Sequence, residues 1–117
     1  PQTVVVNIAS SLPALSAPLS MGGSVTIEGV LTDSQGRPLP NMEIAIGWYP
    51  ENGGRDAEIA RFRTGPDGKF SYQWVISMAS WAVRWVYTGP GYYWLYIRVL
   101  TDGQYGSTQL LVRIWVG

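Results

Sequence analysis

The fold is decided by the stretch between residues 24 and 49, which reads SVTIEGVLT, then DSQGRPLP, then NMEIAIGWY. Apolar and polar residues alternate in the first and last parts, as they do in strands that bury one face. The middle part contains the Asp, Gly and Pro residues that favour turns. In the last part the large apolar side chains share one face: Met42, Ile44, Ile46 and Trp48. The stretch therefore predicts two half-buried strands joined by a turn, with the second strand at 41–49.

The same alternation recurs along the rest of the chain, between turns rich in Gly, Pro, Asp and Asn. The further predicted strands are residues 3–9, 58–64, 69–76, 92–100 and 107–116. We expect 58–64 and 69–76 to form a hairpin around the Gly65–Gly68 turn, and 82–87 to be an extra strand or a folded-over loop. Short strands at this spacing are typical of sandwiches. The sequence therefore predicts an all-β fold, an immunoglobulin-like Greek-key β-sandwich of seven to eight antiparallel strands.

Residues 1–117 are predicted to form a single domain, because a chain of this length supports one hydrophobic core. Residues 1–22 are interpreted as an N-terminal strand followed by a connector rich in Pro and Ser. Residues 77–90 are interpreted as an aromatic-rich insertion. The aromatic side chains expected in the core are Phe70, Tyr72, Trp74 and Tyr93.

The composition excludes several classes of site. The chain has no His and no Cys, which rules out a disulfide, a thiolate metal site and a His-dependent catalytic triad within it. Eight basic residues balance eight acidic ones, which argues against a nucleic-acid partner. The carboxylates are scattered, mostly in turns, with no acid–base pair and no calcium-loop spacing. We therefore expect no enzyme activity, no cofactor and no bound metal.

The sequence carries no sign of a membrane-spanning segment. Its apolar runs are all much shorter than the 18 or so residues of a membrane helix, so we expect no membrane insertion. Residues 1–7 lack the basic start and apolar run of a signal peptide. This indicates either that a signal has been removed or that the chain is a piece of a longer one.

Two stretches resemble a known family. The segment Gly29–Ile44 resembles the G-x-V-x-D-x-x-G-x-P-L-x-x-x-x-V segment of prokaryotic Ig-like and carboxypeptidase-regulatory-like (transthyretin-like) domains. The segment Thr64–Phe70 resembles their T-D-x-x-G-x-F turn. Further on, Gly91-Tyr92-Tyr93 and Asp102–Ser107 are similar to the entries of the last two strands in this family.

These anchors cover roughly residues 23–117, and the insertion at 77–90 departs from the family pattern. The resemblance implies a non-catalytic module, extracellular or at the cell surface, that acts as a spacer, stalk or adhesive unit. It implies no shared functional residues that could be transferred to this chain.

The chain is rich in aromatic residues, with six Trp, seven Tyr and two Phe. If Tyr93 points inwards, as the resemblance implies, its neighbours on the strand alternate outwards. The outward side chains of that strand are then Tyr92, Trp94, Tyr96 and Arg98. The final strand, as an antiparallel neighbour, leaves Leu111, Arg113 and Trp115 outside. On the other side, the small residues Ala45 and Gly47 of the 41–49 strand would leave a shallow floor.

This alternation predicts a ligand or partner patch made of Tyr92, Trp94, Tyr96, Arg98, Arg113 and Trp115, with Trp81 and Trp85 from the insertion. Three interpretations are open. The insertion covers the patch as a small second core, or the patch contacts a neighbouring domain or identical subunit. Alternatively, it stacks against sugar rings, with Arg98, Arg113 and Glu43 as a polar rim.

The N-terminal strand allows a further hypothesis. Val4, Val6 and Ile8 share one face, and the connector behind them contains two prolines and no charge. The strand either pairs within its own sandwich or completes the sheet of the next subunit, which would build a filament.

From the sequence we expect a non-catalytic extracellular structural or adhesive module, whose role is spacing, docking or self-assembly at a cell surface. Its expected partners are neighbouring domains or identical subunits. The alternative function is a carbohydrate-binding module that takes a polysaccharide on its aromatic patch.

Overall fold

The structure, a computed structural model, describes residues 7–10, 18–100 and 108–117. These residues are mostly β, with one short helix. The strands are β1 (Asn7–Ser10), β2 (Ser24–Thr32), β3 (Glu43–Pro50), β4 (Ala57–Arg63), β5 (Lys69–Val75), β6 (Gly91–Leu100) and β7 (Thr108–Val116). The helix α1 (Trp81–Val86) lies between β5 and β6 in the chain.

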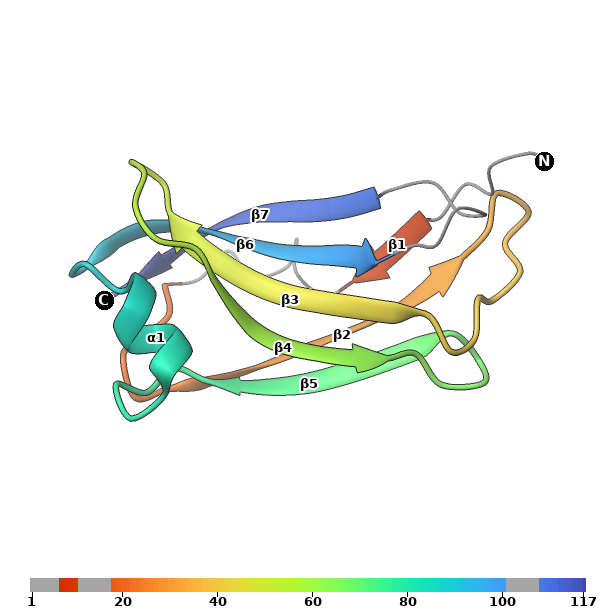
Figure 1. The fold of residues 1–117 in the computed structure, drawn as a ribbon, viewed down its shortest axis with the longest axis horizontal. Helices are drawn as coiled ribbons and strands as arrows, with labels where there is room; N and C mark the ends of the chain where they lie inside the picture. The colour runs from red at the N-terminus through yellow and green to blue at the C-terminus, as the bar shows by residue number, and fades with distance from the viewer. Residues whose placement is uncertain (1–6, 11–17, 101–107) are drawn as a thin grey trace.

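The strands form two antiparallel sheets that pack face to face. One sheet has the order β1-β2-β5 and the other the order β4-β3-β6-β7. The molecule measures 45 by 23 by 23 Å, and the strands run along its long axis (Figure 1). The all-β prediction is therefore confirmed.

The predicted pairing of the late strands is also confirmed. β6 pairs with β7 on one side, with Tyr92 opposite Trp115, and with β3 on the other, with Tyr96 opposite Gly47. Tyr93 points inwards, as expected, and is only 1% exposed.

The core lies between the two sheets and is centred on aromatic rings. Trp48 of β3 is fully buried, and its ring centroid lies 5.0 Å from that of Trp74 and 4.7 Å from that of Tyr93. Phe70 is also buried, and Tyr72 packs against the core from a partly exposed position. The four aromatic residues predicted for the core are thus found in it or against it.

The predicted hairpin of 58–64 and 69–76 is wrong, because β4 and β5 belong to different sheets. The turn itself forms, with a hydrogen bond from the Gly68 amide to the Gly65 carbonyl at 3.0 Å. Its two ends are held by different partners. The buried Thr64 hydroxyl accepts from the Met42 amide and donates to the Leu39 carbonyl, whereas the Gly68 carbonyl accepts from the Leu31 amide of β2. The turn therefore carries the chain from one sheet to the other.

The segment expected to be a strand or a folded-over loop at 82–87 is instead the helix α1. Its buried residues Ala82, Val83 and Val86 recur with helical spacing and join the main core. The Trp48 indole nitrogen donates to the Ala82 carbonyl at 3.2 Å, which fixes the helix against β3. The helix lies at one end of the long axis of the molecule (Figure 1).

The described N-terminal residues contact both sheets. Strand β1 comprises the last three residues of the predicted first strand and the following Ser10. It pairs with β2 of the same chain, with Ile8 opposite Leu31. Val4 and Val6 lie outside the described residues. Further on, Leu19 forms a parallel bridge with Val116 at the end of β7. Along the described part of the chain, no helix has the length and apolar character needed to cross a bilayer.

Candidate functional site

The candidate site lies on the outer face of the four-stranded sheet. Alternation along β6 places Tyr92, Trp94, Tyr96 and Arg98 on this face, and alternation along β7 adds Arg113 and Trp115. Tyr92 is 47% exposed, and Trp94 and Trp115 are partly exposed. The outward register of these six residues is as predicted.

Tyr96 does not contribute an exposed ring. Its side chain is 4% exposed because it lies over Gly47 of β3, where a Cβ atom would collide with the ring. Its hydroxyl donates to Asp56 Oδ1 at 2.9 Å. The floor expected at Gly47 is therefore occupied by Tyr96 itself, and Ala45, which lies opposite Arg98, is also buried.

The buried position of Tyr96 changes its acidity. Burial, reinforced by the hydrogen bond to the Asp56 carboxylate, raises the pKa of Tyr96 from 10.0 to about 12. The neutral hydroxyl is thus the form that the folded protein favours.

We expect the stability that Tyr96 gives over the Tyr96→Phe variant to be lost at high pH. Because the pKa of Tyr96 in the folded protein is about 12 and its ordinary value is 10.0, the contribution is complete below pH 10.0 and is lost as the pH rises towards 12. The difference falls by at most about 1.4 kcal/mol per pH unit. Urea unfolding of both proteins between neutral pH and about pH 12 measures it. A difference that stays constant over this range contradicts the assignment.

The Arg113 side chain extends from β7 across β6 and contacts both Tyr92 and Glu51. Its guanidinium lies 3.7 Å from the centroid of the Tyr92 ring. It also forms two hydrogen bonds with the Glu51 carboxylate, one from Nε to Oε2 and one from Nη2 to Oε1 at 2.9 Å. The hydrogen bond from Arg113 lowers the pKa of the Glu51 carboxyl and raises the pKa of Arg113. The sequence interpretation missed Glu51, because it lies 62 residues from its partner in a loop.

A hollow of about 240 Å³ lies beside this Arg–Glu pair. It is formed by the loop after β3, the turn before β6 and the first residues of β6. The lining residues are Glu51, Asn52, Thr88, Gly89, Pro90, Gly91, Tyr92 and Tyr93. The site therefore combines an exposed aromatic ring with several polar groups.

The expected polar rim of Arg98, Arg113 and Glu43 does not form one cluster. Arg98 lies 4.6 Å from the centroid of the Tyr96 ring and donates to Gln109 Oε1. Glu43 pairs instead with Arg61 and Arg63 of β4, each at 3.9 Å. Only Arg113 of the three contacts Tyr92 in the described residues.

Trp81 and Trp85 form a separate aromatic pair on α1. Their rings are stacked, with centroids 5.9 Å apart and an interplanar angle of 16°. They are 58% and 41% exposed, and the guanidinium of Arg55 lies 4.0 Å from the Trp85 centroid. The buried side of α1 packs into the core, and Tyr92 stays exposed. The helix therefore closes the core rather than covering the Tyr92 surface.

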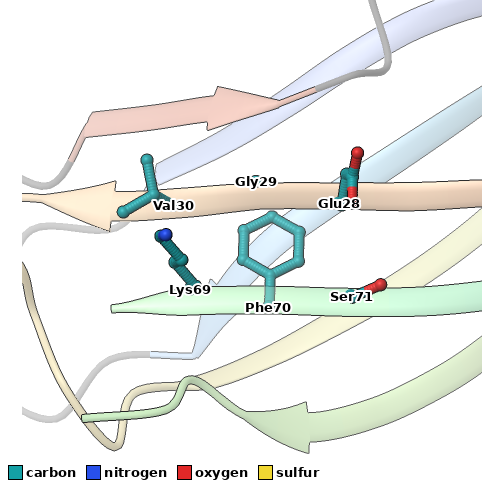
Figure 2. Close-up of a pocket in the computed structure, with 6 residues that line it drawn as sticks. All are labelled: Glu28, Gly29, Val30, Lys69, Phe70 and Ser71. Atoms are coloured by element: carbon teal, nitrogen blue, oxygen red, sulfur yellow. The ribbon is translucent and has the colours of Figure 1, made fainter. Parts of the chain in front are cut away.

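A larger hollow, of about 480 Å³, opens on the three-stranded sheet. It is lined by Glu28, Gly29, Val30, Lys69, Phe70 and Ser71. Figure 2 shows the Phe70 ring extending from β5 towards Gly29 on β2. Phe70 is a buried core residue that covers its cross-strand glycine partner, so this hollow offers no exposed ring for a ligand.

Two of the turn carboxylates have structural partners. Asp33 accepts hydrogen bonds from the Arg37 and Gln35 amides, and these bonds, above all the one from Arg37, lower the pKa of its carboxyl. Asp67 accepts from the Lys69 amide. Within residues 7–10, 18–100 and 108–117, no three acidic residues lie together in a metal-binding group.

The described residues thus define an all-β protein of two packed sheets, with aromatic and arginine side chains on the outer face of the larger sheet. No protein-family model matches the sequence, and no curated protein is detectably similar to it.

Proposed function

We propose that the protein is a non-catalytic extracellular structural or adhesive module with an immunoglobulin-like Greek-key fold. The strand order supports the fold assignment. Lettered in chain order, strands A, B and E form one sheet and C′, C, F and G the other, which is an arrangement found among immunoglobulin-like sandwiches. Folds of this class serve as spacers and docking units in many cell-surface proteins.

One observation carries the proposed docking role. The described residues include five large exposed hydrophobic side chains, and four of them lie close together in the sequence, between the end of β5 and α1: Val75, Met78, Trp81 and Trp85. Exposed apolar groups concentrated on one part of a surface mark interaction sites, and Trp and Arg are enriched at their centres. Arg55 against Trp85 fits this composition. We propose that this end of the module docks on an identical subunit or a neighbouring domain.

Sedimentation velocity over a wide range of protein concentration tests docking between identical subunits. We expect the wild-type chain to self-associate and the double variant Trp81→Ala, Trp85→Ala to stay monomeric. Tyr92→Ala is the matched control, because it removes an exposed ring from a different surface. A wild-type chain that stays monomeric at every concentration counts against self-assembly through α1.

Strand exchange remains a second route to assembly. In the part of the chain that the structure describes, β1 is a four-residue edge strand that pairs with β2. We propose that it can pair with β2 of another subunit in the same register. Deletion of residues 1–10 is expected to abolish polymers formed in this way, whereas polymers that persist after the deletion rule the route out.

Carbohydrate binding is the second candidate function, and the Tyr92 surface favours it. Sugar rings stack on exposed aromatic rings and hydrogen-bond to planar polar groups nearby, and Tyr92, Glu51, Asn52 and Arg113 bring these together. Trp94 and Trp115 extend the same sheet face. Pull-down on insoluble polysaccharides tests this function, and binding that survives Trp94→Ala, Trp115→Ala and Tyr92→Ala argues against the face.

A further inference from the structure

The hollow beside Tyr92 is shaped by segments that hold each other in place. The Tyr93 hydroxyl donates to the Gly89 carbonyl at 2.7 Å and accepts from the Thr88 amide at 2.9 Å. The Glu51 amide donates to the Tyr92 carbonyl at 3.1 Å. These bonds connect the turn before β6 and the loop after β3 to β6 itself. A ligand would therefore meet a largely preformed site, at a low cost in conformational entropy.

The charges of the hollow select against an ionic ligand. Glu51 is the acidic residue in its lining, and its carboxylate is neutralised by two hydrogen bonds from Arg113. The same bonds use Nε and Nη2 of Arg113, and the Glu51 carboxylate balances its charge, so Arg113 attracts an anion only weakly. The remaining polar groups are neutral, among them the Asn52 carboxamide and the Thr88 hydroxyl. This chemistry suits a neutral ligand that carries several hydroxyl groups.

The most exposed stacking surface is the free face of the Tyr92 ring. Arg113 covers the other face of Tyr92, the next outward ring on the strand, Trp94, is only partly exposed, and Tyr96 is buried. A volume of about 240 Å³ is below the roughly 300–1,000 Å³ of sites for drug-sized ligands. On the inner side the hollow ends at Tyr93, which is 1% exposed. A long chain lying along the sheet would need several such surfaces in a row.

We propose that this hollow binds a single neutral sugar ring at the end of a glycan chain. The inference rests on the carbohydrate-binding function proposed above and specifies its ligand. Tyr92 stacks on the apolar face of the terminal ring, and Asn52 and Thr88 hydrogen-bond to its hydroxyl groups. Arg113 and Glu51 fix the orientation of Tyr92 and do not contact the sugar through their paired atoms.

Chain length separates recognition of ends from recognition of chain interiors. The probes are dextran, mannan, xylan and galactan, each as long chains and as short oligomers made from the same stock. Binding is measured by quenching of tryptophan fluorescence, with all probes at equal mass concentration. If ends are recognised, the apparent affinity of the binding probe rises in proportion to the number of chain ends. Tyr92→Ala and Asn52→Ala are expected to weaken binding about tenfold or more.

Two control variants show whether a loss of binding comes from the loss of the stacking ring at this site. Tyr92→Phe keeps the ring and should retain most of the affinity, which separates stacking from misfolding. Trp81→Ala removes an exposed ring on α1 and should leave the affinity unchanged.

Two results would overturn the proposal in different ways. If none of the four polysaccharides binds in either form, both the carbohydrate-binding function and the chain-end site are wrong. If binding follows mass rather than chain ends, and is lost in Trp94→Ala but not in Asn52→Ala, carbohydrate binding stands. In that case the chain-end site is wrong, and the ligand lies along the sheet face.

Discussion

Replacing Trp48 by Ala is expected to lower the free energy of unfolding by about 3–5 kcal/mol. Trp48 is fully buried at the centre of the core, and its ring contacts those of Trp74 and Tyr93. Its indole nitrogen also donates to the Ala82 carbonyl at the start of α1. The substitution therefore leaves a large cavity between the sheets and the helix and removes this hydrogen bond.

Urea unfolding followed by fluorescence measures this effect, and Trp85→Ala is the matched control. Trp85 is 41% exposed, so truncating its ring should cost no more than about 1 kcal/mol. Near-UV circular dichroism of the Trp48 variant should also lose the signal of the packed aromatic cluster. Equal losses of stability in the two variants would show that the Trp48 cluster is not the centre of the core.

Replacing Gly68 by Ala is expected to cost about 2–3 kcal/mol. Gly68 has a φ of +76°, a conformation that residues with a Cβ atom rarely adopt. A Cβ atom there would lie 2.7 Å from the Leu31 carbonyl oxygen and 3.0 Å from the Leu39 amide nitrogen. Both atoms belong to the backbone, the first in β2 and the second in the loop that follows β2. The chain can relieve the contact only by moving the point where it passes between the two sheets.

Gly36 provides the control that separates the two causes. Its φ is +82°, but no atom lies within 4 Å of an added Cβ. Gly36→Ala should therefore carry only the conformational penalty, about 1 kcal/mol. Thermal or urea unfolding of both variants gives the difference, and a Gly68 variant no less stable than the Gly36 variant would contradict the close approach to Leu31.

The alternation of apolar residues was sufficient to predict most of the strands. β2 has the predicted bounds, and the other strands in the described residues differ from their predicted bounds by a few residues. A buried strand face must be apolar, and the period of two makes that face visible in sequence. The outward register of β6 follows from the same argument, once Tyr93 is placed inside.

The sequence could not predict which outward rings stay exposed. Tyr96 and Tyr92 both point outwards on β6. On the β3 side, however, Tyr96 lies opposite Gly47, whereas Tyr92 lies beyond the last paired residue of β3. The space above a glycine lets the Tyr96 ring lie flat on the neighbouring strand, where Asp56 accepts its hydroxyl hydrogen. The difference depends on a cross-strand partner about 50 residues away, which alternation along one strand does not reveal.

The helix was missed for a related reason. Val83 and Val86 are β-branched residues that favour strands, and the six residues of α1 are too few to form a helix without tertiary support. The support comes from Trp48 and from strands β3 and β4 of the four-stranded sheet. The sequence did offer one signal for a helix, the spacing of four residues between Trp81 and Trp85, whose rings stack in the structure.

The pairing of Leu19 with the end of β7 has a mechanical consequence. Three backbone hydrogen bonds join these segments, from Leu19 to Trp115, from Gly117 to Leu19 and from Met21 to Gly117. Because the two segments run parallel, a pull applied between Pro18 and Gly117 acts along both strands in opposite directions. The three bonds then share the tension and must break together, instead of opening one after another. In a chain of modules connected through these two points, the three bonds would therefore oppose the first step of forced unfolding.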